Sequence, residues 1–574
     1  YKKMKNLKND VMKLNIYKII LLALVFGICS CSKDILEKPV QPGSLSDVAL
    51  YRTVNGHEHL LNTAIMSLGE YFDNSRHFPM AYLTLGSIRS DDAWSGIGVV
   101  DDWFAFDVNE NDIFAENMYV EAMYKSHYLS LRYCNLIINN AHYAIEENPG
   151  EESIERIDNL VAQAKALRAF NYLYLTRAYG DLVIILNSSI VQKPRSSSEE
   201  VYEQVFKDLD EAISSGALKK RTELPNSELG QITLGAARAF LTKAYMHYAA
   251  EDPENAMDHF TNAYNTAKAL IESGEYDLLP TYDQLWQYDS KFREESIFEI
   301  GYPEPDENYL QHHWWASWMR PLYIYKKGTR EFVGTDSYRG WGHNTPSQDF
   351  VNSFETGDPR LHWSVWFQGD ATAGLSEGDD LREICFVASE SGYYFRKTTP
   401  EKYYPTLKSF LGFKLIRYAD ILLLGAEAAN EIGQTADALS WLELVRARAR
   451  NTSAARNHED DVIDGVPVEI TTGNQAELRN IIRQERRIEL GGEGERFYDL
   501  KRWHGTHGYD IKKIIEDAAK VVGPDYLITT NSDLSGKPRE PKSVIMDLPK
   551  DLLLPIPQDE ININNGIIKQ NQGF

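Results

Sequence analysis

The chain has 574 residues with 84 acidic and 60 basic side chains, which gives a formal net charge of −24. This acidity argues against binding to nucleic acid and against binding to anionic lipid through charge. The length allows a large core in one big domain or in two intimate lobes, and no apolar run after residue 30 is long enough to span a membrane.

The N-terminal segment has the pattern of a lipoprotein signal peptide. Six lysines precede or border an apolar run at 19–28, which is too short to cross a bilayer. Small Ser30 precedes Cys31, whereas bulky Ile28 precedes Cys29, so Cys31 is the better processing site. Cleavage would remove residues 1–30 and leave a lipid on Cys31. An ordinary signal peptide cut nearby is the alternative, and either of two methionines in this segment could be the true start.

Two cysteines lie outside the leader region, Cys134 and Cys385. They could pair, but Cys134 lies in a helical pattern and is more simply a buried thiol.

Helical periodicity organises the first half of the chain and returns later. The motif LTRAY at 175–179 is echoed by LTKAY at 241–245, at an offset close to twice the roughly 34-residue tetratricopeptide period. We expect each copy to end a first helix and a second helix to follow it. Further helices are expected at 118–145, 199–212, 255–271, 419–432 and 436–450. The pattern predicts four tetratricopeptide-like helix pairs, with a generic helical bundle as the alternative.

The segment at about 274–410 interrupts these helices. It is dense in Pro, Gly, Asp and aromatic residues and predicts long loops and short strands, including a strand at 296–300. The only helical hint is a short apolar stretch at about 348–354. Prolines in 32–56 and 523–574 disfavour helix, so both segments are expected to be extended arms.

Two aromatic-rich tracts, 71–103 and 309–341, are the candidate binding surface. Sugars present apolar C–H faces ringed by hydroxyl groups, which aromatic rings can cover while acidic, amide and guanidinium groups bind the hydroxyls. The candidate contacts are Asp91, Trp94, Trp314, Trp315, Trp318, Tyr338 and Trp341. For each tryptophan the alternative is a core position in the loop-rich lobe.

Catalytic and metal-binding motifs find little support in the sequence. The histidines at 312–313 lack the spacing of a helical metal pair. Adjacent Asp91 and Asp92 cannot face each other across a glycosidic bond. The aspartates at 460–464 could bind a cation, but their spacing is not that of an EF-hand, and a solvated acidic loop is favoured. We therefore expect no catalytic residue, cofactor or metal.

The stretch 485–503 is the most distinctive segment of the chain. Leu478, Ile482 and Ile488 form an apolar stripe beside which Glu485 and Glu489 fall, and buried carboxylates there need partners. Three glycines at 491–494 then break the helix before a second one begins. We predict a buried, structural ion-pair corner between two helices, whose charged members are Glu485, Arg486, Glu489, Arg496, Asp499 and Arg502.

This corner is one of four motifs that occur in order along most of the chain. The others are LRAFNYLYLTRAYGD at 167–181, RYADILLLGAE at 417–427 followed by VRAR, and a chain end that runs from LPIPQDE at 554–560 to QNQGF. Together they resemble the SusD/RagB family of outer-membrane glycan-binding lipoproteins of Bacteroidetes.

The resemblance implies a mainly α fold: a tetratricopeptide-like scaffold with a large loop-rich lobe and few short strands. It implies one domain over 31–574, with its helical core at about 115–272 and 411–510. The expected function is a non-enzymatic, lipid-anchored, surface-exposed protein of the outer membrane. It would bind oligo- or polysaccharide and deliver it to a TonB-dependent transporter of the SusC type.

Two other functions are open at this point. A secreted glycoside hydrolase would need two carboxylates about 5–9 Å apart in a groove. A helical-repeat adaptor would bind peptide in its concave face, although the lipoprotein leader argues against an intracellular one. The sequence does not indicate which glycan or other nutrient is bound, or whether a calcium ion is.

Overall fold

The computed structural model describes residues 50–69, 78–96, 102–187, 192–302, 315–320, 323–326, 340–367, 384–387, 391–398, 410–455, 458–523 and 541–574. The leader prediction for residues 1–30, the anchor Cys31, and the candidates Trp314 and Tyr338 lie outside these ranges.

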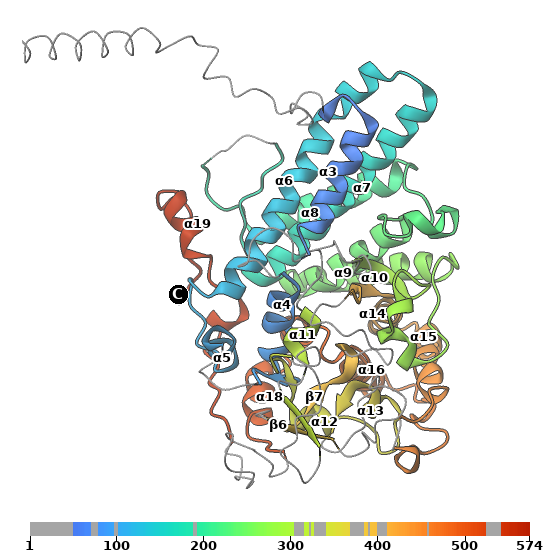
Figure 1. The fold of residues 1–574 in the computed structure, drawn as a ribbon, viewed down its shortest axis with the longest axis vertical. Helices are drawn as coiled ribbons and strands as arrows, with labels where there is room; N and C mark the ends of the chain where they lie inside the picture. The colour runs from blue at the N-terminus through green and yellow to red at the C-terminus, as the bar shows by residue number, and fades with distance from the viewer. Residues whose placement is uncertain are drawn as a thin grey trace, which may run out of the picture.

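A stack of antiparallel helices forms the scaffold. Consecutive helices pack on one another, and α3, α6 and α7 run together through the upper part of Figure 1. The helices of this part are α3 (Val54–Met66), α6 (Met118–Glu147), α7 (Glu151–Tyr179), α8 (Ser198–Ser214), α9 (Leu234–Glu251) and α10 (Ala256–Ile271). Local signals set their starts: Ser197 and Glu200 form a capping box at α8, and Thr233 caps α9.

The stack continues after the loop-rich segment, because α10 packs on the next long helix, α14. The later helices are α14 (Tyr418–Glu431), α15 (Thr435–Arg450), α16 (Gln475–Leu490), α17 (Arg496–His507) and α18 (Ile511–Ala518). The predicted fold class, mainly α with a tetratricopeptide-like scaffold and few short strands, is confirmed. One detail differs: α9 continues past Tyr245 to Glu251, so the second motif copy lies inside its helix.

Short elements fill the lower lobe of Figure 1. The helices among them are α4 (Phe78–Leu83), α5 (Trp103–Asn109), α11 (Trp315–Met319), α12 (Gln348–Val351) and α13 (Arg360–Ser364), with a π-helical turn η2 (Thr84–Ile88) after α4. The 3₁₀ turns of the described residues are η3 (Arg221–Glu223), η4 (Asn226–Glu228), η5 (Pro253–Asn255), η6 (Tyr282–Trp286), η7 (Tyr288–Ser290), η9 (Arg396–Thr398), η10 (Glu459–Asp461) and η11 (Lys550–Leu552).

The strands of the described residues form two-stranded antiparallel pairs, β1–β4, β2–β8, β3–β6 and β5–β7. They are β1 (Ala93–Trp94), β2 (Ser296–Ile300), β3 (Tyr323–Lys326), β4 (Thr345–Pro346), β5 (Val365–Trp366), β6 (Ile384–Val387), β7 (Tyr394–Phe395) and β8 (Phe413–Arg417). The predicted strand at 296–300 is therefore present as β2. It joins the loop-rich segment to β8, which leads directly into α14.

The two predicted arms are less extended than expected. The first prediction was wrong at its end, because α3 begins at Val54 and Thr53 caps it by accepting a hydrogen bond from the backbone N–H of Gly56. The C-terminal arm contains a short helix, α19 (Gln558–Ile563), which begins directly after Pro557. The arm returns to the scaffold, since the backbone N–H of Leu554 donates to the carbonyl of Ala178.

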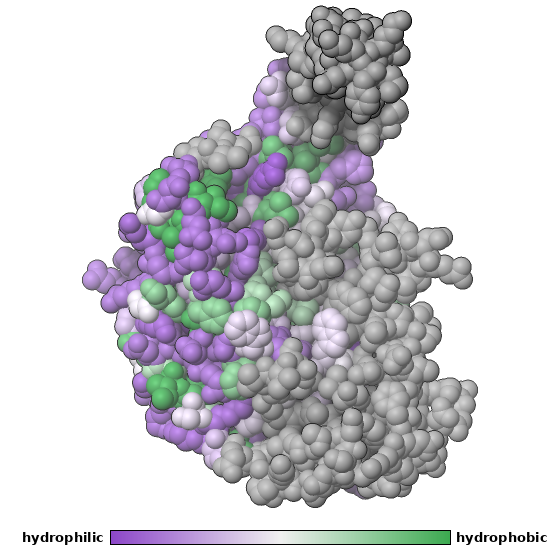
Figure 2. Space-filling view, turned by 60° about the vertical axis from the view of Figure 1, so that its left-hand side comes forward, coloured by the Kyte–Doolittle hydropathy of each residue, from purple (hydrophilic) through white to green (hydrophobic). Residues whose placement is uncertain are grey.

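One large apolar core joins the scaffold to the loop-rich lobe, and a smaller cluster lies beneath α13. Cys134 is a buried free thiol in the first core, and burial raises its pKa to about 12. Hydrophilic side chains dominate the described part of the face in Figure 2, with smaller hydrophobic patches among them. Among the helices of the described ranges, none combines the length and apolar character needed to cross a membrane.

Candidate functional site

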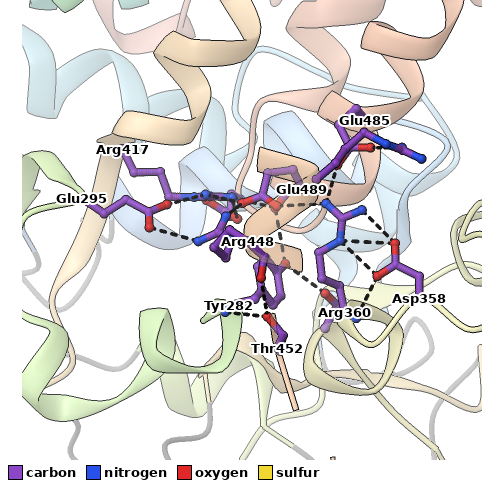
Figure 3. A network of polar contacts seen from close by, with 12 residues as sticks. Tyr282, Glu295, Asp358, Arg360, Arg417, Arg448, Thr452, Glu485 and Glu489 are labelled. Atoms are coloured by element: carbon purple, nitrogen blue, oxygen red, sulfur yellow. Dashed lines mark hydrogen bonds and ion pairs between the residues drawn. The ribbon is translucent and has the colours of Figure 1, made fainter. Parts of the chain in front are cut away.

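A buried ion-pair network surrounds the predicted corner. Glu489 on α16 is fully buried, and its carboxylate accepts hydrogen bonds from Arg417, Arg448 and Arg360 (Figure 3). The Arg417 Nη1 to Glu489 Oε1 distance is 2.5 Å. Burial alone would raise the pKa of Glu489, but the three arginines outweigh it and hold that pKa far below its ordinary value.

Each of these arginines also has a second carboxylate. Arg360 pairs with Asp358 and Glu485, as Figure 3 shows. Glu295 accepts hydrogen bonds from Arg417 and Arg448, each at 3.0 Å. Arg417 further contacts Glu493, and Arg446 contacts Glu485. Each of these three buried arginines therefore contacts at least two carboxylates, so none of their charges is unpaired in a site that excludes water.

The other members of the predicted corner face a second group of acids. Arg486 on α16 binds Asp499 and Asp420, and Arg502 on α17 binds Asp499 and Glu427. Because Glu427 also accepts the indole N–H of Trp503 at 2.8 Å, the two helices and α14 are joined by charged and polar contacts.

Glycines at the turn between α16 and α17 allow a close approach to η2. Gly494 has φ of +87°, which favours glycine. A Cβ on Gly86 would lie 1.9 Å from the carbonyl oxygen of Gly494. The Gly-rich turn therefore fits against a π-helical turn that itself needs a glycine.

Asp91 and Asp92, which follow η2, are buried in this framework. Arg496 donates to both oxygens of Asp91 at 2.8 Å, and Arg487 donates to Asp92 at 2.8 Å. Burial acts to raise the pKa of Asp91, but Arg487 and Arg496 hold it below its ordinary value. Burial dominates for Asp92 and raises its pKa. The carboxylate of Asp91 is thus directed into the protein.

The structure brings the two aromatic tracts together. Strands β1 and β4 pair Ala93 with Pro346 and Trp94 with Thr345, so the first tract lies beside the residues that directly follow the second, and α11 of the second tract packs on α4 of the first. The backbone N–H of Asn344 donates to the carbonyl of Ser95 at 3.2 Å, which extends this contact. The paired residues lie about 250 positions apart in the sequence, so the periodicity of the sequence does not reveal their contact.

Three of the candidate tryptophans are buried at this junction. Trp318 is 1% exposed and stacks on His343 at 5.1 Å, and Trp94 and Trp315 are 6% and 4% exposed. Lys542 lies 4.8 Å from the centre of the Trp94 ring. These three rings therefore occupy core positions in the loop-rich lobe, which was the alternative to direct contact with sugar.

Two indoles in the described residues are exposed, Trp341 at 39% and Trp103 at 55%. Trp103 begins α5 and lies 4.5 Å from the ring of Phe104. Asp102, which caps α5, accepts a hydrogen bond from Tyr119, and the Tyr119 ring lies 6.0 Å from that of Trp318. Trp103 belongs to the first predicted tract but was not singled out as a contact. Its position at a helix start, after the N-cap Asp102, was the available signal.

Two cavities lie elsewhere. One of about 510 Å³ is lined by polar residues of α3 and α7, including Glu58, Arg156 and Gln163. The other, of about 610 Å³, lies between residues 113–116 and the C-terminal arm and includes Phe574. Neither is lined by a predicted site residue.

Comparisons with known proteins agree along most of the chain. Residues 283–574 match a family model described as the SusD family, and residues 46–246 match one described as starch-binding associating with outer membrane. A SusD-like protein P2 from Formosa agariphila is 25% identical, with 97% of this chain and 99% of the relative covered.

Solved structures show the same fold. A SusD-like protein from Bacteroides fragilis has a TM-score of 0.69 at 21% identity, with 94% of this chain and 100% of that chain covered. Surface glycan-binding protein A from Bacteroides thetaiotaomicron, solved in complex with laminarihexaose, has a TM-score of 0.67 at 20% identity. In that comparison 90% of this chain and 99% of the other are covered.

Proposed function

Because the chain belongs to the SusD/RagB family, we propose that it binds oligo- or polysaccharide at the cell surface and delivers it to a TonB-dependent outer-membrane transporter of the SusC type. Carbohydrate binding is supported by the similar fold whose structure contains laminarihexaose. The proposals of delivery to the transporter, of a lipid anchor at Cys31 and of a surface location rest on the same family membership.

The observation that carries the binding proposal is the exposure of two indoles, Trp103 and Trp341, next to residues with buried aromatic contacts. Asp102 and Tyr119 link the α5 end to Trp318, and Trp318 stacks on His343, two residues after Trp341. Exposed indoles on an ordered support offer apolar faces to the C–H patches of a sugar with little loss of conformational entropy. We therefore propose that Trp341 and Trp103 contact glycan, and that buried Trp94, Trp315, Trp318 and Asp91 support this surface.

A binding role without catalysis is supported by the state of the buried acids. A glycoside hydrolase needs an acid whose pKa is raised beside a second carboxylate that reaches the substrate. The pKa of Glu489 is instead held low by three arginines, and both oxygens of Asp91 are engaged by Arg496. Asp92 has a raised pKa beside Asp91, but it is fully buried and binds Arg487, so it does not reach a substrate. These carboxylates stabilise the fold and are closed to a sugar.

Binding can be tested with a panel of polysaccharides that includes laminarin and starch. We expect the purified protein to be retained by at least one, without release of reducing ends. Trp341→Ala and Trp103→Ala should each weaken binding by roughly tenfold or more in calorimetry, with unchanged melting temperatures.

The matched control is Tyr143→Ala on α6, which removes a ring that is 38% exposed and far along the scaffold. It should bind as the parent protein does. Retention by none of the polysaccharides would contradict the carbohydrate proposal. Normal affinity in both tryptophan variants would instead place the contact surface elsewhere.

A further inference from the structure

Two histidines and an aspartate converge in the loop-rich lobe, away from the aromatic junction. His362 lies on α13, and His458 and Asp461 lie at the turn η10, almost a hundred residues later. One nitrogen of each ring and one carboxylate oxygen all lie within 4.8 Å of one another. A carboxylate oxygen of Asp461 is 2.7 Å from Nδ1 of His458 and 3.5 Å from Nε2 of His362.

The two imidazole rings are parallel and close. Their centroids lie 3.5 Å apart, with an interplanar angle of 12°. Two protonated rings in this arrangement would repel each other across one carboxylate. A cation between the rings and Asp461 would relieve this repulsion, once the rings turn out of their stack so that a lone pair of each points at the ion.

The surrounding charges favour a cation at this point. Glu459 and Asp460 are exposed in the same turn and add negative charge. Among the described residues, Arg396 is a nearby cation. Its guanidinium lies over the Trp363 ring at 4.2 Å and donates to the backbone carbonyl of His362, so this hydrogen bond is to the backbone of α13 and not to an imidazole nitrogen.

We propose that His362, His458 and Asp461 bind a divalent transition-metal ion of the Zn²⁺ class. Two imidazole nitrogens and one carboxylate oxygen suit Zn²⁺, whereas Ca²⁺ takes oxygen ligands. Two donors at about 2.1 Å from a tetrahedral ion are about 3.4 Å apart, which is close to the 3.5 Å between His362 and Asp461. The 2.7 Å contact between His458 and Asp461 is a hydrogen bond, which the ion would replace. The Asp461 side chain is 55% exposed, so water can complete the coordination.

Such an ion would link the turn at 458–461 to α13, at the edge of the buried ion-pair network. His362 follows Arg360 by two residues, and Arg360 binds Glu485 and Glu489. The loop is already held by hydrogen bonds from Ile463 to the Gly357 carbonyl and from the Trp363 indole to the Ser453 carbonyl. The metal would brace these contacts, and its loss should leave the helical scaffold folded.

The test uses the full mature chain without a histidine tag, stripped with chelator and dialysed. Titration with ZnCl₂ in a calorimeter, with elemental analysis of the dialysed protein, should show one equivalent bound and a raised melting temperature. Asp461→Asn and His458→Gln should each weaken Zn²⁺ binding by at least about tenfold and remove the thermal shift.

Asp460→Asn is the matched control, because it removes the same charge one residue away from the cluster. It should keep both the affinity and the thermal shift of the parent protein. Asp461 is exposed, so its variant should fold as the parent does in chelator. Absence of bound Zn²⁺ in the parent, parent-like affinity in Asp461→Asn, or binding of CaCl₂ in place of ZnCl₂ would each overturn the proposal.

Discussion

Replacing Glu489 with glutamine removes one negative charge from the centre of the buried network and nearly preserves the volume. Arg360, Arg417 and Arg448 would each lose a charge-assisted hydrogen bond. None would be left without a carboxylate, because Asp358, Glu485, Glu493 and Glu295 remain as partners.

The expected loss in the free energy of unfolding is therefore about 3 kcal/mol, at the lower end of the range for breaking a buried pair. It is well below the sum of three separate hydrogen bonds to charged groups, each worth about 1.5–3 kcal/mol. Urea unfolding followed by tryptophan fluorescence measures it at neutral pH. Glu477→Gln is the control, since Glu477 is exposed near the start of the same helix.

The pH dependence gives a second readout. The folded-state pKa of Glu489 is lowered from its ordinary value of 4.5, so its stabilisation is fully present above pH 4.5 and is lost as the pH falls. The stability difference between the parent and Glu489→Gln should shrink below pH 4.5 by up to about 1.4 kcal/mol per pH unit. Equal stability at neutral pH, or a difference that stays constant under acid conditions, would refute the reasoning.

Three further outcomes are expected. Gly86→Ala should abolish folding or lower the free energy of unfolding by roughly 1–3 kcal/mol or more, because its Cβ would meet the Gly494 carbonyl. The control Gly473→Ala has open space and should be neutral, so similar denaturation curves for the two variants would contradict this prediction. Cys134 should resist alkylation at pH 8 in the native protein and react after unfolding, as peptide mass mapping can show; rapid native labelling would disprove its burial. Cys31→Ala should release the protein from membranes in detergent-free fractionation; a variant that stays bound, with no lipid mass on Cys31 of the parent, would rule out the anchor.

The long helices could be predicted from sequence because burial repeats along each of them. On α8, Val201, Val205 and Leu209 are fully buried on one face, and this face alone locates the helix. The strand β2 was also predictable. The prediction that the motif at 241–245 ends its helix was wrong. A repeated local motif indicates which face of a helix is buried, but it does not determine where the helix ends.

The partners of the buried acids could not be predicted in the same way. Arg486 and Arg502 are close to Glu489 in sequence, yet they bind Asp499, Asp420 and Glu427. Glu489 instead binds Arg448, about 40 residues earlier on α15, together with Arg360 and Arg417 from more distant segments. Sequence indicates that a buried carboxylate needs a cation, and only the tertiary fold decides which one.

The same limit applied to the aromatic tracts. Composition indicated a surface rich in indoles, but Trp318 is buried and Trp341, in the same tract, is exposed. In the described residues, Trp318 lies on α11, which packs on α4 of the other tract, whereas Trp341 follows that helix by more than twenty residues.

The contact between Arg496 and Asp91 joins residues 405 positions apart, and Asn571 donates to the carbonyl of Tyr179, 392 positions away. The buried carboxylate of Asp91 thus depends on a cation that is translated about 400 residues later. A chain that stops before α17 keeps Asp91 without this partner, and one that lacks its last residues leaves the end of α7 uncovered. We therefore expect chains truncated at either point to be more sensitive to proteolysis than the chain that keeps both contacts.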